Sequence, residues 1–101
     1  MSESIAFKKS EILYAVKLEN GNFFILNFKN GRSLQFPMDL WSSVANQFSK
    51  IEPKSPMMIN FEHLIVCHRI GNDINMHFED CFRCVNHPES ELIWGYICRS
   101  I

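Results

Sequence analysis

Short apolar runs separated by turn-forming residues fill the first third of the chain. The dipeptides Asn20-Gly21 and Asn30-Gly31 each stand between two such runs. Asn-Gly favours the type I′ hairpin turn, because both central residues of that turn need a positive φ. The pattern therefore predicts a three-stranded antiparallel meander. Its strands are expected at residues 12–19, 22–29 and 32–36.

The lengths of the two turns determine which residues share a face of this sheet. A two-residue loop at Asn20-Gly21 pairs Val16 with Ile25, and a two-residue loop at Asn30-Gly31 places Phe36 beside Ile25. On this register one face is apolar and the other is apolar in its middle, so both faces need a cover. The first face is expected to carry Ile12, Tyr14, Val16, Leu18, Phe23, Ile25, Leu34 and Phe36. The second is expected to carry Leu13, Ala15, Lys17, Phe24, Leu26, Phe28, Ser33 and Gln35.

A helix is expected to follow the meander. Trp41, Val44, Ala45 and Phe48 stand at positions i, i+3, i+4 and i+7, which is the spacing of one buried helix face. Pro37 suits the first turn of such a helix. Two prolines in the segment 51–56 predict that the helix ends before them and that a linker follows.

The second half of the chain is expected to return to strands. Residues 61–70 and 74–79 flank a turn-forming triplet at 71–73, which predicts a β-hairpin. The last apolar segment, residues 92–98, is interpreted as a strand, although Ser90 could begin a short helix there instead. As a strand, this segment would have one face made of Leu92, Trp94, Tyr96 and Cys98.

These elements predict an α+β fold in the order β-β-β-α-β-β-β. It would consist of one or two antiparallel sheets with one main amphipathic helix packed on the sheet. With 101 residues, of which 47% are hydrophobic, the chain is long enough for a core but too short for a second ordinary domain. We therefore expect a single domain over residues 1–101.

Charge and hydropathy narrow the classes of function. Ten basic and eleven acidic residues give a net charge of −1, which argues against a dedicated nucleic-acid-binding protein. The first ten residues lack the apolar stretch of a signal peptide. No apolar run reaches the length of about 18 residues that a membrane-spanning helix needs. A cytoplasmic protein with reduced thiols is therefore expected, with neither a membrane nor nucleic acid as its direct partner.

An acidic segment is the strongest local bias of charge. Residues 73–91 carry five carboxylates against a single basic residue, Arg83. Such a segment could attract a basic protein surface, so it is the predicted partner-binding edge. The alternative is an ordinary solvated rim. The five carboxylates belong to Asp73, Glu79, Asp80, Glu89 and Glu91.

The segment 81–87 is the only local cluster of reactive side chains. Cys81, Cys84 and His87 follow one another at intervals of three residues, and Cys67 lies upstream. Zinc needs four converging ligands, and a structural site normally has a second pair with equally close spacing, which this chain lacks. These four residues are therefore kept only as an alternative metal site, and neither a metal nor another cofactor is predicted.

Catalysis through the cysteines has weak support as well. A thioredoxin-like Cys-x-x-Cys site requires a helix after its first cysteine, and Pro88 would end such a helix within a turn. A pair of Cys67 with His77 would lack an oxyanion hole and a third, orienting group. We therefore predict that the chain is not an enzyme and has no catalytic residues.

By elimination, the expected function is non-catalytic protein binding. The most concrete hypothesis is a small immunity, antitoxin or inhibitor protein that blocks a partner, which could have a basic, nuclease-like surface. One alternative is a small metal-binding or thiol-active protein that uses Cys67, Cys81, Cys84 and His87. Another is a homodimeric subunit with a purely structural role.

Overall fold

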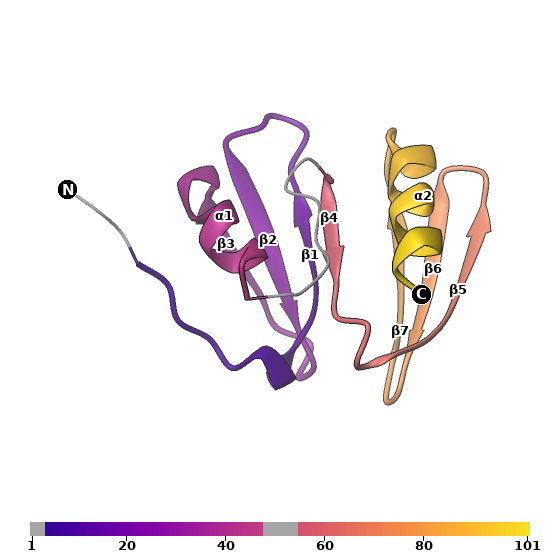
Figure 1. The fold of residues 1–101 in the computed structure, drawn as a ribbon, viewed down its shortest axis with the longest axis horizontal. Helices are drawn as coiled ribbons and strands as arrows, with labels where there is room; N and C mark the ends of the chain where they lie inside the picture. The colour runs from indigo at the N-terminus through magenta and orange to yellow at the C-terminus, as the bar shows by residue number, and fades with distance from the viewer. Residues whose placement is uncertain (1–3, 48–54) are drawn as a thin grey trace. The chain divides into compact units, whose positions relative to one another are not determined.

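The computed structural model describes residues 4–47 and 55–101 of the chain. The chain divides into two compact units, Met1–Asn60 and Phe61–Ile101. Each unit contains one antiparallel sheet, with four strands in the first and three in the second (Figure 1). The predicted α+β class with antiparallel sheets is therefore confirmed, whereas the single domain stays a prediction.

The first unit contains the predicted meander. Its strands are β1 (Ile12–Lys17), β2 (Phe23–Phe28) and β3 (Ser33–Pro37). A fourth strand, β4 (Met57–Ile59), pairs antiparallel with β1 and gives the sheet the order β3-β2-β1-β4. The hydropathy pattern does not predict β4, because three residues are too few to display a period of two.

Both Asn-Gly dipeptides form turns of the meander, with a positive φ of 75° at Gly21 and 88° at Gly31. The predicted two-residue loops are wrong, because the closing hydrogen bonds leave loops of four residues, 19–22, and three residues, 29–31. In each loop the asparagine side-chain oxygen accepts a hydrogen bond from the backbone N–H two residues later. These Asx turns accompany loops that are longer than the two-residue loop of a type I′ turn.

Loop length decides the register of the strands. The four-residue loop preserves the predicted pairing of Val16 with Ile25, which is confirmed. The three-residue loop moves β3 by one position, so Phe36 lies opposite Phe24. The predicted placement of Leu34 and Phe36 on the face of Ile25 is therefore wrong, because an odd shift in register transfers every side chain of a strand to the other face.

A β-bulge changes the face of Ile12 as well. The register of β1 shifts between Ile12 and Tyr14, which pairs Ile12 with Phe28. Ile12 consequently joins Ala15 in the core, and its predicted place on the face of Tyr14 is wrong. A bulge adds one residue to a strand, and neither hydropathy nor turn composition indicates it here.

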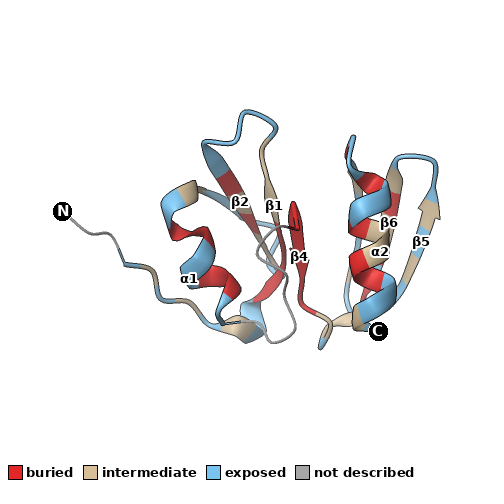
Figure 2. Ribbon diagram, turned by 45° about the horizontal axis from the view of Figure 1, so that its top comes forward, coloured by how far each residue is buried: buried red, intermediate tan, exposed pale blue. Residues whose placement is uncertain are grey.

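The core of the first unit lies between the sheet and the short helix α1 (Trp41–Ala45). The predicted helix face is buried at Trp41, Val44 and Ala45 (Figure 2). Phe48 and residues 51–54 of the predicted linker lie outside the described residues. Short 3-10 turns, Lys9–Glu11 and Met38–Leu40, precede β1 and α1. The core cluster consists of Ile12, Ala15, Phe24, Leu26, Leu40, Trp41, Val44, Ala45 and Met58.

Substituting Gly31 by valine is expected to lower the free energy of unfolding by about 1–2 kcal/mol, because a β-branched residue resists a positive φ. An added Cβ would meet no heavy atom within 4 Å, so the loss would come from the backbone alone. The matched control is Gly31→Asn, since asparagine tolerates the left-handed region. Urea denaturation should rank the parent above Gly31→Val, with Gly31→Asn near the parent. Equal stability of Gly31→Val and the parent would contradict this conformation.

The second unit has the sheet order β5-β6-β7. Its strands are β5 (Leu64–Ile70), β6 (Asp73–Phe78) and β7 (Phe82–Asn86). The hairpin between β5 and β6 confirms the predicted turn, in which Gly71 has a φ of 59°. β7 is a strand that the sequence analysis does not assign, and it pairs antiparallel with β6.

The C-terminal segment is a helix, so the predicted strand over residues 92–98 is wrong. The helix α2 spans Ser90–Ser100 and begins at the serine that was the alternative helix start. Its buried residues recur at helical spacing, whereas Leu92 and Cys98, which would share a strand face, are exposed. These buried residues are Ser90, Ile93, Tyr96 and Ile97. In the described parts of the chain, no helix is both long and apolar enough to span a membrane.

Candidate functional site

One face of the three-stranded sheet is covered by α2 and the other is open. α2 contacts β6, on which Ile74, Met76 and Phe78 are buried. The alternate residues of β6 and their cross-strand partners form the opposite face, which we call the open face. It consists of three cross-strand rows: Val66, His77 and Phe82; His68, Asn75 and Cys84; and Ile70, Asp73 and Asn86.

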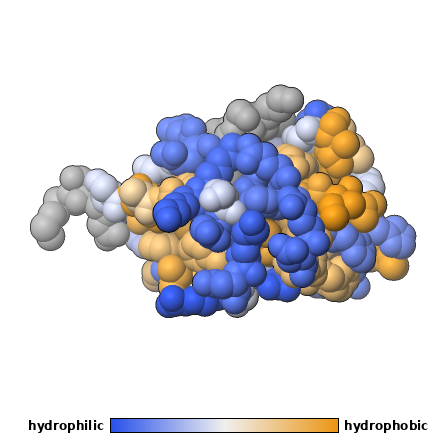
Figure 3. Space-filling view, turned by 90° about the horizontal axis from the view of Figure 1, so that it is seen from below, coloured by the Kyte–Doolittle hydropathy of each residue, from blue (hydrophilic) through white to orange (hydrophobic). Residues whose placement is uncertain are grey.

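The open face presents apolar side chains to solvent. Val66, Ile70 and Phe82 are exposed, as is Ile65 at the β-bulge of β5. The rings of Phe82 and His77 lie 4.8 Å apart, centroid to centroid, so they form a joined surface. Hydrophobic side chains also reach the surface beside hydrophilic ones in Figure 3. Exposed apolar groups that adjoin one another are typical of contact surfaces.

The predicted acidic edge is divided between the two ends of this sheet. Asp73 begins β6, and Glu79 and Asp80 follow its last residue. A strand of six residues is about 17 Å long, so these carboxylates form two groups. Glu89 and Glu91 lie in the group of Asp73, because the backbone before α2 is hydrogen-bonded to the turn between β5 and β6.

Some of these carboxylates have partners within the unit. The Glu79 carboxylate lies 3.2 Å from Nδ1 of His63, and the Glu91 carboxylate lies 3.9 Å from the Arg69 guanidinium. The Asp73 carboxylate accepts a hydrogen bond of 2.6 Å from the Asn86 side-chain amide. An exposed pair such as Arg69 with Glu91 contributes little stability. The carboxylates therefore remain able to contact a partner, and their role in binding stays a prediction.

The four residues of the alternative metal site do not converge. Cys67 lies on the α2 side of the sheet and Cys84 on the open face, because they flank adjacent residues of β6. Cys81 lies in the turn before β7, where its carbonyl accepts a hydrogen bond from the Phe78 N–H. In residues 4–47 and 55–101, no group of three or more His, Cys, Asp or Glu is arranged to hold a metal ion.

His87 has a structural position at the start of α2. It is buried, and its Nδ1 accepts a hydrogen bond of 3.0 Å from the Glu89 backbone N–H. The Ser90 hydroxyl donates to the Asn72 side-chain oxygen over 3.0 Å. These two bonds satisfy backbone and side-chain groups at the helix start. His87 therefore anchors α2 in this structure and lies apart from Cys81 and Cys84.

Cys67 and His77 are not placed to form a nucleophilic pair either. Cys67 lies opposite Met76 and His77 lies opposite Val66, so the two side chains are on different faces. Burial raises the pKa of the Cys67 thiol to about 11, with a smaller contribution from Cys98. A neutral thiol is a poor nucleophile, so Cys67 is not activated.

Cys67 is expected to react with iodoacetamide more slowly than Cys84 and Cys98 at pH 9, because the thiolate is the reacting species. The unfolded thiol ionises from about 9 and the folded thiol from about 11. The stability that neutral Cys67 contributes is therefore complete below pH 9 and falls between pH 9 and 11. Mass spectrometry after timed alkylation measures the rates. Cys67→Ala should lessen the alkaline fall in stability; an identical fall would contradict the assignment.

The sequence analysis missed the apolar residues of the open face. Val66 belongs to the apolar run 64–67, in which a β-bulge hides the alternation, and His68 and Arg69 separate Ile70 from that run. Phe82 belongs to β7, whose sequence does not alternate between apolar and polar residues, since both Cys84 and Val85 are apolar. The exposure of Phe82, Cys84 and Asn86 is therefore visible only in the structure.

Comparison with known proteins does not assign this chain to a family. No family model matches the chain, and neither a curated protein nor a solved structure matches it.

Proposed function

We propose that this chain is a non-catalytic protein-binding module that covers a surface of another protein, as immunity, antitoxin and inhibitor proteins do. The observation that carries the proposal is the open face of the three-stranded sheet, with its exposed apolar side chains between two groups of carboxylates. Exposed apolar side chains bordered by polar and charged groups are usual in protein–protein contacts.

The main apolar residue of the proposed contact is Phe82 on the edge strand β7, with Val66 and His77 in the same cross-strand row. Large aromatic residues supply a large share of the binding energy at many interfaces. The flat surface of a β-sheet holds these side chains in fixed positions, so little conformational entropy is lost on binding. Phe82 is therefore the anchor of the proposed interface.

The carboxylates at both ends favour a partner with basic groups around an apolar patch. A basic cleft, such as that of a nuclease, would meet Glu79 and Asp80 at one end and Asp73 at the other. Opposite charges of this kind raise the association rate more than they raise affinity. The association rate should then fall as salt rises, since the Debye length is about 8 Å at physiological ionic strength.

The test compares two exposed apolar residues of the same unit. Phe82 and Leu92 are exposed to 48% and 49%, but Phe82 lies on the open face and Leu92 on α2. With a partner identified by co-purification, Phe82→Ser should weaken binding by about 30-fold or more, the effect of losing an aromatic residue that dominates the binding energy. Leu92→Ser should leave the affinity unchanged, and circular dichroism should show both variants folded.

Three outcomes would contradict the proposal. Equal affinity of Phe82→Ser and the parent would remove the open face from the contact. A dimer of the chain alone that Phe82→Ser dissociates would support a homodimeric subunit instead. Stoichiometric zinc in protein purified without a histidine tag, lost together with the fold, would support the metal-binding alternative.

A further inference from the structure

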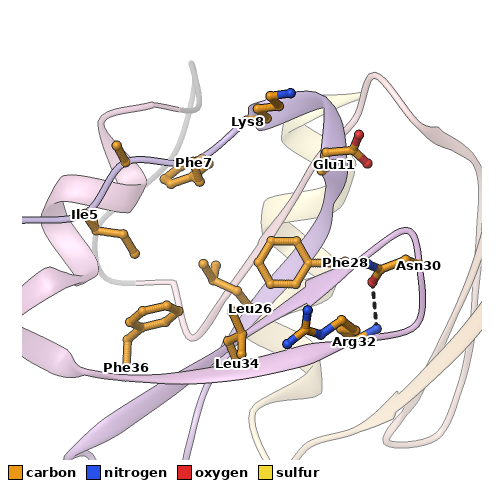
Figure 4. Close-up of a pocket in the computed structure, with 11 residues that line it drawn as sticks. Ile5, Phe7, Lys8, Glu11, Leu26, Phe28, Asn30, Arg32, Leu34 and Phe36 are labelled. Atoms are coloured by element: carbon orange, nitrogen blue, oxygen red, sulfur yellow. Dashed lines mark hydrogen bonds between the residues drawn. The ribbon is translucent and has the colours of Figure 1, made fainter.

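The first unit contains a hollow of about 610 Å³ beside its sheet (Figure 4). It lies between the N-terminal segment and the strands β2 and β3. Its residues belong to the first unit, whereas the open face belongs to the second. Its volume is within the range of about 300–1,000 Å³ that is common for small-molecule sites. Its apolar lining includes Ile5, Phe7, Leu26, Phe28, Leu34 and Phe36.

The hollow arises because two different segments cover the core face of the sheet. The helix α1 packs on Phe24, whereas the extended segment that contains Ile5 and Phe7 packs against the core near Phe28 and Phe36. An extended segment is thinner than a helix and leaves space above the strands. Figure 4 shows the side chains of Ile5 and Phe7 on one side of this space and those of the strands on the other.

The walls of the hollow are apolar. Leu26 is fully buried at its floor, and Phe28 and Phe36 are partly buried beside it. Leu34 is exposed on the outer strand β3, so one wall is accessible from solvent. An apolar, accessible space of this kind is suited to a hydrocarbon chain, which would replace water against these side chains.

The lining of the hollow also includes charged groups. Lys8 and Arg32 carry positive charges and Glu11 carries the only negative charge in the lining, and Figure 4 shows the ring of Phe28 between Lys8 and Arg32. Within the described parts of the chain, no ion pair involves these three side chains. The backbone of Arg32 is held by a hydrogen bond of 2.9 Å to the Asn30 side-chain oxygen. The guanidinium therefore extends from a fixed turn, and the charged side chains of the lining have a net positive charge.

We propose that this hollow binds a single-chain amphiphile with an anionic head group, represented by a fatty acid. The alkyl chain lies against Phe28, Leu34 and Phe36, and the carboxylate is held by Arg32. A planar guanidinium binds a carboxylate through two parallel hydrogen bonds, which gives the site a preference for anions. This site belongs to the first unit and does not depend on the proposed function of the second.

The ligand preference can be measured with soluble probes below their micelle concentrations. Calorimetry should show laurate binding with one molecule per chain, and decanoate about 15-fold more weakly, since each buried methylene contributes roughly fourfold. Dodecyltrimethylammonium, with the same chain and the opposite charge, should bind at least tenfold more weakly than laurate, the effect of a charge-assisted contact. Amide shifts in an NMR titration should be confined to residues near 5–11 and 26–36.

Two variants locate the site. Leu34→Trp should fill the exposed wall and abolish laurate binding, whereas Leu92→Trp, at another exposed leucine in the second unit, should not. Arg32→Gln should weaken laurate by about tenfold and leave dodecyltrimethylammonium unchanged. Arg32 is exposed, so this variant tests the proposal even if Leu34→Trp does not fold.

Several results would overturn the proposal. The first is the absence of saturable laurate binding at 1 mM, a concentration on the order of the weakest specific dissociation constants. The second is equal affinity for laurate and dodecyltrimethylammonium. The third is laurate binding that Leu34→Trp leaves unchanged. Sedimentation of the protein with phosphatidylglycerol vesicles in the absence of laurate binding would also overturn it, because the ligand would then be a membrane surface.

Discussion

Replacing Phe24 by alanine is expected to lower the free energy of unfolding of the first unit by about 3–5 kcal/mol. Phe24 is fully buried in the core cluster. Its ring meets the edge of Trp41 at a centroid distance of 5.2 Å and lies 5.9 Å from the ring of Phe36. Because α1 has only five residues, its place on the sheet depends on such side-chain contacts rather than on its own hydrogen bonds.

The measurement is urea denaturation followed by fluorescence, since the chain has two tryptophans, Trp41 in the first unit and Trp94 in the second. Phe82→Ala is the matched control, because it removes the same atoms from an exposed site and should cost less than about 1 kcal/mol. Similar losses for the two variants would mean that Phe24 does not fill the core. A small loss of stability for Phe24→Ala would mean that the contact of Phe24 with Trp41 does not hold α1 on the sheet.

Replacing Ile93 by alanine is expected to cost about 2–5 kcal/mol in the second unit. Ile93 is fully buried on α2, whereas its neighbour Leu92 is exposed. The substitution Leu92→Ala should therefore change stability by less than about 0.5 kcal/mol. The pair distinguishes a helix from a strand in this segment, because a strand would bury Leu92 together with Trp94 and leave Ile93 outside.

Thermal unfolding followed by circular dichroism would measure both losses, and the helical signal of α2 should disappear with the fold. A larger loss for Leu92→Ala than for Ile93→Ala would contradict the helix and restore the strand interpretation. It would also remove the cover from Ile74 and Met76, because α2 packs against β6.

The candidate site could be predicted only in part from the sequence. The charge of residues 73–91 is visible in the composition, but its separation into two groups depends on the direction of β6 and on the bonds that attach α2 to the preceding turn. The exposure of Phe82 depends on which face α2 covers. The hollow beside Phe28 depends on a segment about twenty residues earlier in the chain, so no local pattern indicates it.

The sequence by itself determined the features that depend on local sterics and period. The positive φ at Gly21 and Gly31, the three strands of the meander and the buried face of α1 at Trp41 all follow from residue type and spacing. Tertiary structure alone decided the parity of β3, the pairing of β4 and the helix at Ser90–Ser100. Each of these depends on which distant segment supplies hydrogen bonds or apolar contacts, and short apolar runs fit a strand or a helix until such a partner is in place.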